Sequence, residues 1–298
     1  MRPDIRSDEA ALGILRSLYQ VVRDTVSVLG EDRDPEDLHD FRVALRRTRT
    51  ALRHLEKVFP DGEARLHRKR LASVMRGTGP LRDLDVLLRR ERAFRGMVPP
   101  EHRKDLPGLF DALRKRRAQI FRTVRQALEE ESTRATLSEW KRFLDRPPGG
   151  DDPPRAALPI GKLAGKRIRR QYRRVLRAGD DAGNDPSDSR LHRLRIECKE
   201  LRYLLEFFSG LFPPSAAAAR IRSLKRLQDL LGGIHDLREQ ERLLRSALRR
   251  PSRKGGEKRR PDPPGIGMLF EAIGRERRIL VESFGDAFRT FRKTSPPP

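Results

Sequence analysis

Apolar residues recur at spacings of three and four along most of the chain, which is the period of an amphipathic α-helix. The first such run extends from Leu12 to Leu29, and we expect Gly30 to end it. Gly79-Pro80 predicts a break, after which another run begins at Leu81. No stretch alternates Val, Ile, Thr and aromatic residues as a half-buried strand does. The pattern predicts an all-α protein, with further helices over about residues 38–58, 65–76, 106–128 and 133–144.

The second half of the chain repeats the first. Residues 38–49 (LHDFRVALRRTR) match residues 191–202 (LHRLRIECKELR) at a shift of 153 positions. The shift persists without a gap, since Phe59-Pro60 falls on Phe212-Pro213 and Gly79 falls on Gly232. A shared frame of this length indicates that one helical unit has been duplicated. We expect a single domain over residues 1–298, with repeats over 8–145 and 158–293.

Two stretches rich in proline and glycine predict connections between helices. Residues 146–157 (RPPGGDDPPRAA) lie near the chain midpoint and are expected to link the repeats. Residues 249–267 are expected to form a basic loop.

Each repeat carries a row of cations on one helix face. At about 100° per residue, the members of the first row share an arc of roughly 80°, and an apolar stripe fills the adjacent arc. The row of the first repeat is His39, Arg42, Arg46, Arg49 and Arg53, and that of the second is His192, Arg195, Lys199 and Arg202.

Like charges on neighbouring helical turns repel one another by roughly a few tenths of a kcal/mol per pair. A ligand with closely repeated negative charge would relieve this repulsion, and the arginine fork can donate two hydrogen bonds to a phosphate. The alternative is a solvated cationic face. Repetition of the row, and its place beside the apolar stripe, favour a binding site.

Other basic residues extend this predicted surface. Asp83 and Asp236 are matched acids, which we interpret as helix caps or as carboxylates that orient an arginine. Like charge should lower the pKa of His39 and His192, so that a neutral imidazole donates one hydrogen bond to a phosphate oxygen. The further candidates are Lys69, Arg76 and Arg82 in the first repeat, Lys166, Arg170 and Arg173 before the second row, and Arg222, Lys225 and Arg226 near a second expected glycine turn.

Composition narrows the classes of partner. The formal net charge is +24, and 37% of the residues are charged, so the chain attracts polyanions. No apolar run reaches the length of a membrane span, and the N-terminus has no secretory pattern, so we expect no membrane partner and a cytoplasmic location. Cys198 is the sole cysteine and is expected to be a buried thiol. We find neither a carboxylate cluster for a metal nor a glycine-rich phosphate loop, which predicts no cofactor and no enzymatic activity.

The motifs resemble the CHAD family, the conserved-histidine α-helical domain. The matching pieces are the two rows, with Gly79-x-Leu81-Arg82-Asp83 following the first and Leu224-Lys225-x-Leu227-Gln228 following the second. The resemblance implies two four-helix bundles related by a pseudo-twofold axis, with a basic groove or pore between them. It also implies binding of inorganic polyphosphate through the two rows, and association with polyphosphate granules. The second repeat departs from the first at His235, which stands where the first has Arg82.

The resemblance leads to one main hypothesis and three alternatives. Inorganic polyphosphate is the expected partner, because aromatic residues make up 6% of the chain and a polymer without bases needs no stacking platform. The first alternative is binding to the phosphate backbone of a nucleic acid, or to another polyanion. An enzyme that acts on polyphosphate and a helical scaffold for partner proteins are the other two.

Overall fold

The structure is a computed structural model that describes residues 1–29, 34–148, 153–248 and 262–293. Within these ranges the chain is almost entirely helical, and its β-structure is limited to one isolated bridge between Arg6 and Pro159. The all-α prediction is therefore confirmed. The expected stop at Gly30, the middle of the 146–157 linker and most of the 249–267 loop lie outside the described residues.

The helices of the two halves follow the same register. The shift of 153 positions carries α2 onto α9 and the 3-10 helix η2 onto η4, residue for residue. It also carries the start of α1 onto that of α8 and the end of α6 onto that of α11. The first half contains α1 (Ser7–Val28), α2 (Pro35–His54), η2 (Glu56–Val58), α3 (Glu63–Gly77), α4 (Gly79–Arg89), α5 (Glu91–Gly96), η3 (Pro100–Asp105), α6 (Pro107–Glu129) and α7 (Glu131–Leu144). The second contains α8 (Ile160–Asn184), α9 (Asp188–Phe207), η4 (Ser209–Leu211), α10 (Pro214–Leu248), α11 (Pro264–Glu282) and α12 (Phe284–Arg292).

The halves differ where α3 and α4 meet. Pro80 has no backbone N–H, and a helix that ran through it would lose a hydrogen bond and clash with the preceding turn. The chain therefore breaks at Thr78 and begins again as α4. In the second half Gly233 stands in place of Pro80, and α10 runs through the same point as one 35-residue helix. The expectation of a second glycine turn at Gly232 is wrong for this reason.

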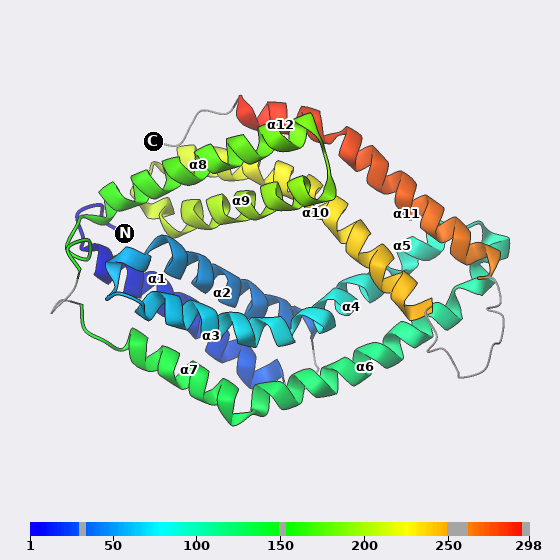
Figure 1. The fold of residues 1–298 in the computed structure, drawn as a ribbon, viewed down its shortest axis with the longest axis horizontal. Coiled ribbons are helices and arrows are strands. Elements are labelled where there is room, and N and C mark those ends of the chain that lie inside the picture. The colour runs from blue at the N-terminus through cyan, green and yellow to red at the C-terminus, as the bar shows by residue number, and fades with distance from the viewer. Residues whose placement is uncertain (30–33, 149–152, 249–261, 294–298) are drawn as a thin grey trace.

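Two apolar cores hold the helices together, and each takes residues from both halves. The larger core includes Phe41 and Leu45 of α2 together with Leu194 and Leu201 of α9. The smaller core joins α4, α5 and α6 to the C-terminal part of α10 and to α11, with Leu237 among its members. Figure 1 shows the C-terminal part of α10 running away from α8 and α9 toward α4 and α6 of the first half, which it contacts together with α11.

Backbone hydrogen bonds tie the start of α1 to the start of α8. The Ser7 N–H donates to the Leu158 carbonyl oxygen at 2.9 Å, and the Ile160 N–H donates to the Ile5 carbonyl oxygen at 2.9 Å. These bonds hold the starts of the first helices of the two repeats next to each other. None of the described helices is long and apolar enough to cross a membrane.

Candidate functional site

A cavity of ≈ 930 Å³ lies between α2 and α9, with further walls from α3, α4 and α10. Seven arginines and one lysine line it, against four carboxylates. Tyr203 is the one aromatic residue of its wall other than the histidines. The first predicted row and two members of the second, Arg195 and Lys199, therefore meet across one strongly cationic space.

The structure places eight of the predicted residues in this wall. The other predicted residues do not line it. Those in the wall are His39, Arg42, Arg46, Arg49, Arg53, Arg82, Arg195 and Lys199.

The remaining predicted residues lie outside this wall, and most of them are exposed to solvent. Arg202 packs over the Tyr203 ring, 5.4 Å from its centroid, and lies 3.7 Å from Glu206. Arg170 lines a second, smaller cavity. The exposed ones are Lys69, Arg76, Lys166, Arg170, Arg173, His192, Arg222, Lys225 and Arg226.

Arg42 is fixed by the end of α3. Its Nη1 donates to the Met75 carbonyl oxygen and to Thr78 Oγ1, both at 2.8 Å. The last carbonyls of a helix have no partner within the helix, so this guanidinium supplies one. Burial, together with the charge of Arg46, lowers the pKa of Arg42. Arg42 therefore supports the wall as well as contributing charge to it.

Arg46, Arg49 and Lys199 form no ion pair within 4 Å with any carboxylate of the described ranges. Arg49 donates instead to the sulfur of Met75 at 3.8 Å. Burial, followed by the charges of Arg195 and Arg46, lowers the pKa of Lys199 to about 7. These cations lie in the cavity with their charge uncompensated, which is the arrangement that an anionic ligand would stabilise.

The matched acids lie inside helices and do not cap them. Asp236 approaches Arg195, with 3.8 Å between Oδ1 and Nη2, as expected of a carboxylate that orients an arginine. Asp83 lies in the interior of α4, whose N-cap is Thr78, so the cap interpretation is wrong. Burial raises the pKa of Asp83, although the charge of Arg42 opposes the shift.

The pKa values of His39 and His192 are both lowered, in the direction expected from the sequence. Burial is the largest cause, followed by the charge of Arg82 for His39 and of Arg195 for His192. The rings of His192 and His235 lie 5.2 Å apart, and burial lowers the pKa of His235 to about 4. His235 lines the cavity and donates or accepts there as a neutral ring.

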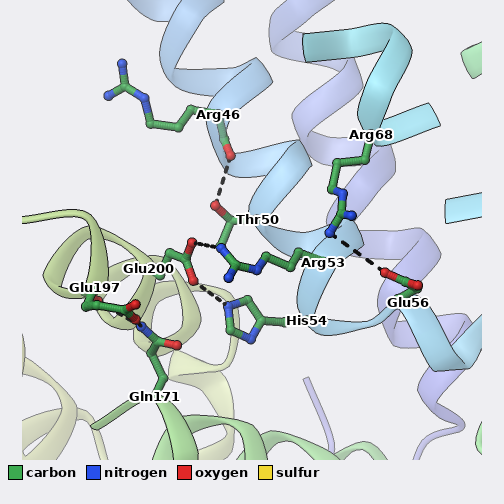
Figure 2. A network of polar contacts seen from close by, with 9 residues as sticks. All are labelled: Arg46, Thr50, Arg53, His54, Glu56, Arg68, Gln171, Glu197 and Glu200. Carbon is green, nitrogen blue, oxygen red and sulfur yellow. Dashed lines mark hydrogen bonds and ion pairs between the residues drawn. The ribbon is translucent and has the colours of Figure 1, made fainter. Parts of the chain in front are cut away.

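A buried carboxylate joins the two row helices. Glu200 of α9 accepts hydrogen bonds from Arg53 and His54 at the end of α2, with 3.2 Å between His54 Nε2 and Glu200 Oε2. Figure 2 shows the carboxylate between these two side chains. Glu200 and Arg68 of α3 also line the cavity, and the sequence analysis missed both. Neither follows the helical spacing of a row, so the sequence gives no signal for them.

The protein therefore belongs to the class of all-helical proteins in which two copies of one helical unit surround a cationic cavity. The CHAD domain model matches residues 13–245, and the chain therefore belongs to the CHAD domain family. No curated protein matches the chain.

Two solved structures share the fold. The CHAD domain from the plant Ricinus communis has a TM-score of 0.76 at 22% sequence identity, over 100% of this chain and 96% of that one. PptA from Streptomyces chartreusis has a TM-score of 0.73 at 18% identity, over 97% of this chain and 100% of that one.

Proposed function

We propose that the protein binds inorganic polyphosphate in the cavity between α2 and α9, without chemical conversion. The observation that carries the proposal is the meeting of two repeat-related cation rows in one space, where Arg46, Arg49 and Lys199 lack carboxylate partners among the described residues. A chain of phosphates offers closely spaced negative charge to both rows at once. Family membership and the resemblance of the motifs point to the same ligand.

The wall chemistry favours this polymer over a nucleic acid. Proteins that bind single strands combine cationic grooves with aromatic platforms for the bases. Here Tyr203 is the one non-histidine aromatic of the wall, and its ring is already contacted by Arg47 and Arg202.

Competition is the direct test. A labelled long-chain polyphosphate bound to the full chain should be displaced by unlabelled polyphosphate and not by equal phosphate concentrations of duplex DNA or RNA. The double variant Arg46→Glu with Lys199→Glu should lose most of the binding. Equal displacement by nucleic acid, or unchanged affinity in the variant, would overturn the proposal. Circular dichroism of the variant checks that its helices remain.

The absence of catalysis is part of the proposal. Within the described ranges, no group of three or more His, Cys, Asp or Glu residues is placed to hold a metal ion. Orthophosphate release from polyphosphate is the measurement, made with and without Mg²⁺ or Mn²⁺. Release that depends on the chain would contradict this part. We further propose association with polyphosphate granules, which the Arg46→Glu, Lys199→Glu variant should lose in a fluorescent fusion.

A further inference from the structure

A second, smaller cavity of ≈ 160 Å³ lies beside the main one. Arg53 and His54 at the end of α2 form one side of it, and Arg167, Arg170, Gln171 and Arg174 of α8 form the other. The α8 residues are spaced as one face of a helix. The volume suits a single small anion.

Three arginines of α8 that line this cavity have no carboxylate of the described chain in direct contact, although the charges of Glu56 and Glu200 interact with Arg167 and Arg174 from further away. Within the described ranges, Arg167, Arg170 and Arg174 form no ion pair within 4 Å. Arg167 Nε is also buried without a hydrogen-bond partner. A buried guanidinium N–H without an acceptor costs free energy, which an anion in the cavity would recover.

Gln171 gives this cavity a hydrogen-bond acceptor in addition to the arginine donors. Its side chain is 1% exposed, and its Nε2 donates to the Glu197 carbonyl oxygen at 3.1 Å and to Glu197 Oε2 at 2.6 Å. Those two bonds fix the amide, and Oε1 is left buried with no partner in the described part of the chain. A ligand that satisfies the cavity therefore needs acceptors for the arginines and one donor for Gln171.

The contact between Arg53 and Glu200 separates the two cavities. Arg53 lines both, while Glu200 lines the main one. In Figure 2, Arg46 lies on one side of this contact and Gln171 on the other. The two cavities therefore adjoin each other and have one arginine in common.

We infer that the small cavity is a site for a phosphate group that carries a P–OH, either orthophosphate or the end of a phosphate chain. Such a group offers oxygens to Arg167 and Arg174 and donates its hydroxyl to Gln171 Oε1. Internal units of a chain have no hydroxyl and leave Gln171 unsatisfied. The second ionisation of a phosphate group falls near about pH 6, so the hydroxyl is present on part of the ligand close to neutral pH. The interpretation that the site holds the end of a phosphate chain rests on the proposed function, whereas the interpretation that it holds orthophosphate does not.

Three probes test the hydroxyl requirement. Orthophosphate and linear tripolyphosphate carry P–OH groups at about pH 6.5, whereas cyclic trimetaphosphate consists only of internal units. Titrations use the full chain with Arg46→Gln and Lys199→Gln, which removes two cations of the main cavity in order to weaken binding there. We expect orthophosphate and tripolyphosphate to bind, and trimetaphosphate to bind at least about tenfold more weakly. Equal binding of the cyclic and linear probes would overturn the inference.

The site is tested by adding Arg167→Gln with Arg174→Gln, which should weaken tripolyphosphate by about tenfold or more. The matched control is Arg169→Gln with Arg177→Gln, which removes two exposed charges from the same helix. The single variant Gln171→Leu should weaken the linear probes and leave the cyclic one unchanged. If the Arg167, Arg174 variant binds as its control does, the small cavity is no phosphate site.

Long-chain polyphosphate with free or blocked ends separates the two sources of the phosphate, here with Arg46 and Lys199 intact. If the Arg167, Arg174 variant binds the free-ended polymer more weakly and the blocked polymer as before, the site holds chain ends. If the variant loses binding of orthophosphate and keeps binding of both polymers, the site holds the free ion. Long-chain binding that survives Arg46→Glu with Lys199→Glu would instead count against the proposed function and leave this site standing.

Discussion

His54 and Glu200 share a buried hydrogen bond of 3.2 Å between Nε2 and Oε2, although 146 residues separate them along the chain. Burial alone would raise the pKa of Glu200, but the hydrogen bond from His54 and the charge of Arg53 hold it below its ordinary value. The carboxylate is therefore ionised at neutral pH. It joins the two row helices and also places a negative charge in the wall of the cavity.

Replacing Glu200 should have opposite effects on stability and binding. Glu200→Gln removes the charge that holds Arg53 and should lower the free energy of unfolding. The loss should be limited to about 1–2 kcal/mol because solvent screens the partly exposed Arg53. The same change removes one of four carboxylates from the cavity, so polyphosphate affinity should rise. Urea unfolding and a binding titration measure the two effects. Glu271→Gln, at an exposed position of α11, is the control. A stabilised variant, or one with weaker binding, would contradict this account.

Arg42 and Arg46 should behave differently although they are neighbours in one row. Arg42→Gln removes the charge-assisted hydrogen bonds to the Met75 carbonyl oxygen and to Thr78 Oγ1, although the Thr78 hydroxyl still donates to Met75. The loss should cost about 1–3 kcal/mol of stability. Arg46→Gln breaks no such bond, so stability should change by about 0.5 kcal/mol or less while polyphosphate affinity falls. Thermal unfolding and titration of both variants, side by side, decide the matter. Equal losses of stability would show that Arg46 also supports the wall.

Lys199 should make binding depend on pH. Its surroundings are Arg195 and Arg202 on α9, Arg46 on α2 and Asp236 on α10, and its pKa is lowered to about 7. A bound polyanion favours the charged ammonium, so binding takes up a proton above pH 7. Affinity for long-chain polyphosphate should then fall by about tenfold or more between about pH 7 and pH 9. Lys199→Arg stays charged and should flatten this profile. A profile that is identical in the two proteins would assign the pH dependence elsewhere.

The stability of the free protein should change with pH in the opposite direction. The pKa of Lys199 is lower in the folded chain than in the unfolded one, so the unfolded state binds more protons between about pH 7 and pH 10.5. Stability therefore rises with pH through that window, as far as Lys199 contributes. Lys199→Met should remove the rise. Urea unfolding of both proteins at several pH values measures it, and a rise that persists in Lys199→Met would rule out this residue as its source.

The continuous α10 can be tested at Gly232. No atom lies within 4 Å of a Cβ added there, so Gly232→Ala should stabilise the helix by about 0.5–1 kcal/mol. Gly233→Pro, at the position that matches Pro80, removes a helical N–H and should cost about 3 kcal/mol. Helicity and the midpoint of urea unfolding are the measurements. A neutral proline variant would mean that α10 tolerates the break that Pro80 makes in the first half.

Much of the fold could be predicted from the sequence because it depends on local pattern. The apolar period gave the helices, and the shift of His39 onto His192 gave a register that α2 and α9 obey along their whole length. The row spacing also placed Arg46 and Lys199 on the cationic faces of their own helices, and the family resemblance implied that the two faces share the groove that the structure shows. The helices and the rows depend on residues a few positions apart on one helix, and the register follows from comparing the two halves of the sequence.

The rest depends on how helices that are distant in sequence pack together. Glu200 and Arg68 enter the cavity wall from outside the rows, and only the packing of α9 and α3 against α2 brings them there. His192 holds the same repeat position as His39 yet is more exposed. The fused α10 follows from one residue, Gly233, which a repeat alignment treats as an ordinary difference.

The sharing of both apolar cores between the repeats has a thermodynamic consequence. Unfolding one repeat would strip apolar cover from Phe41 and Leu194 alike, and from Leu84 and Leu237 alike. Unfolding one repeat while the other stays folded therefore has a high free-energy cost. The chain should denature in a single calorimetric transition whose enthalpy belongs to all of its helices, and a half chain cut at the linker would expose the surface that normally meets its twin.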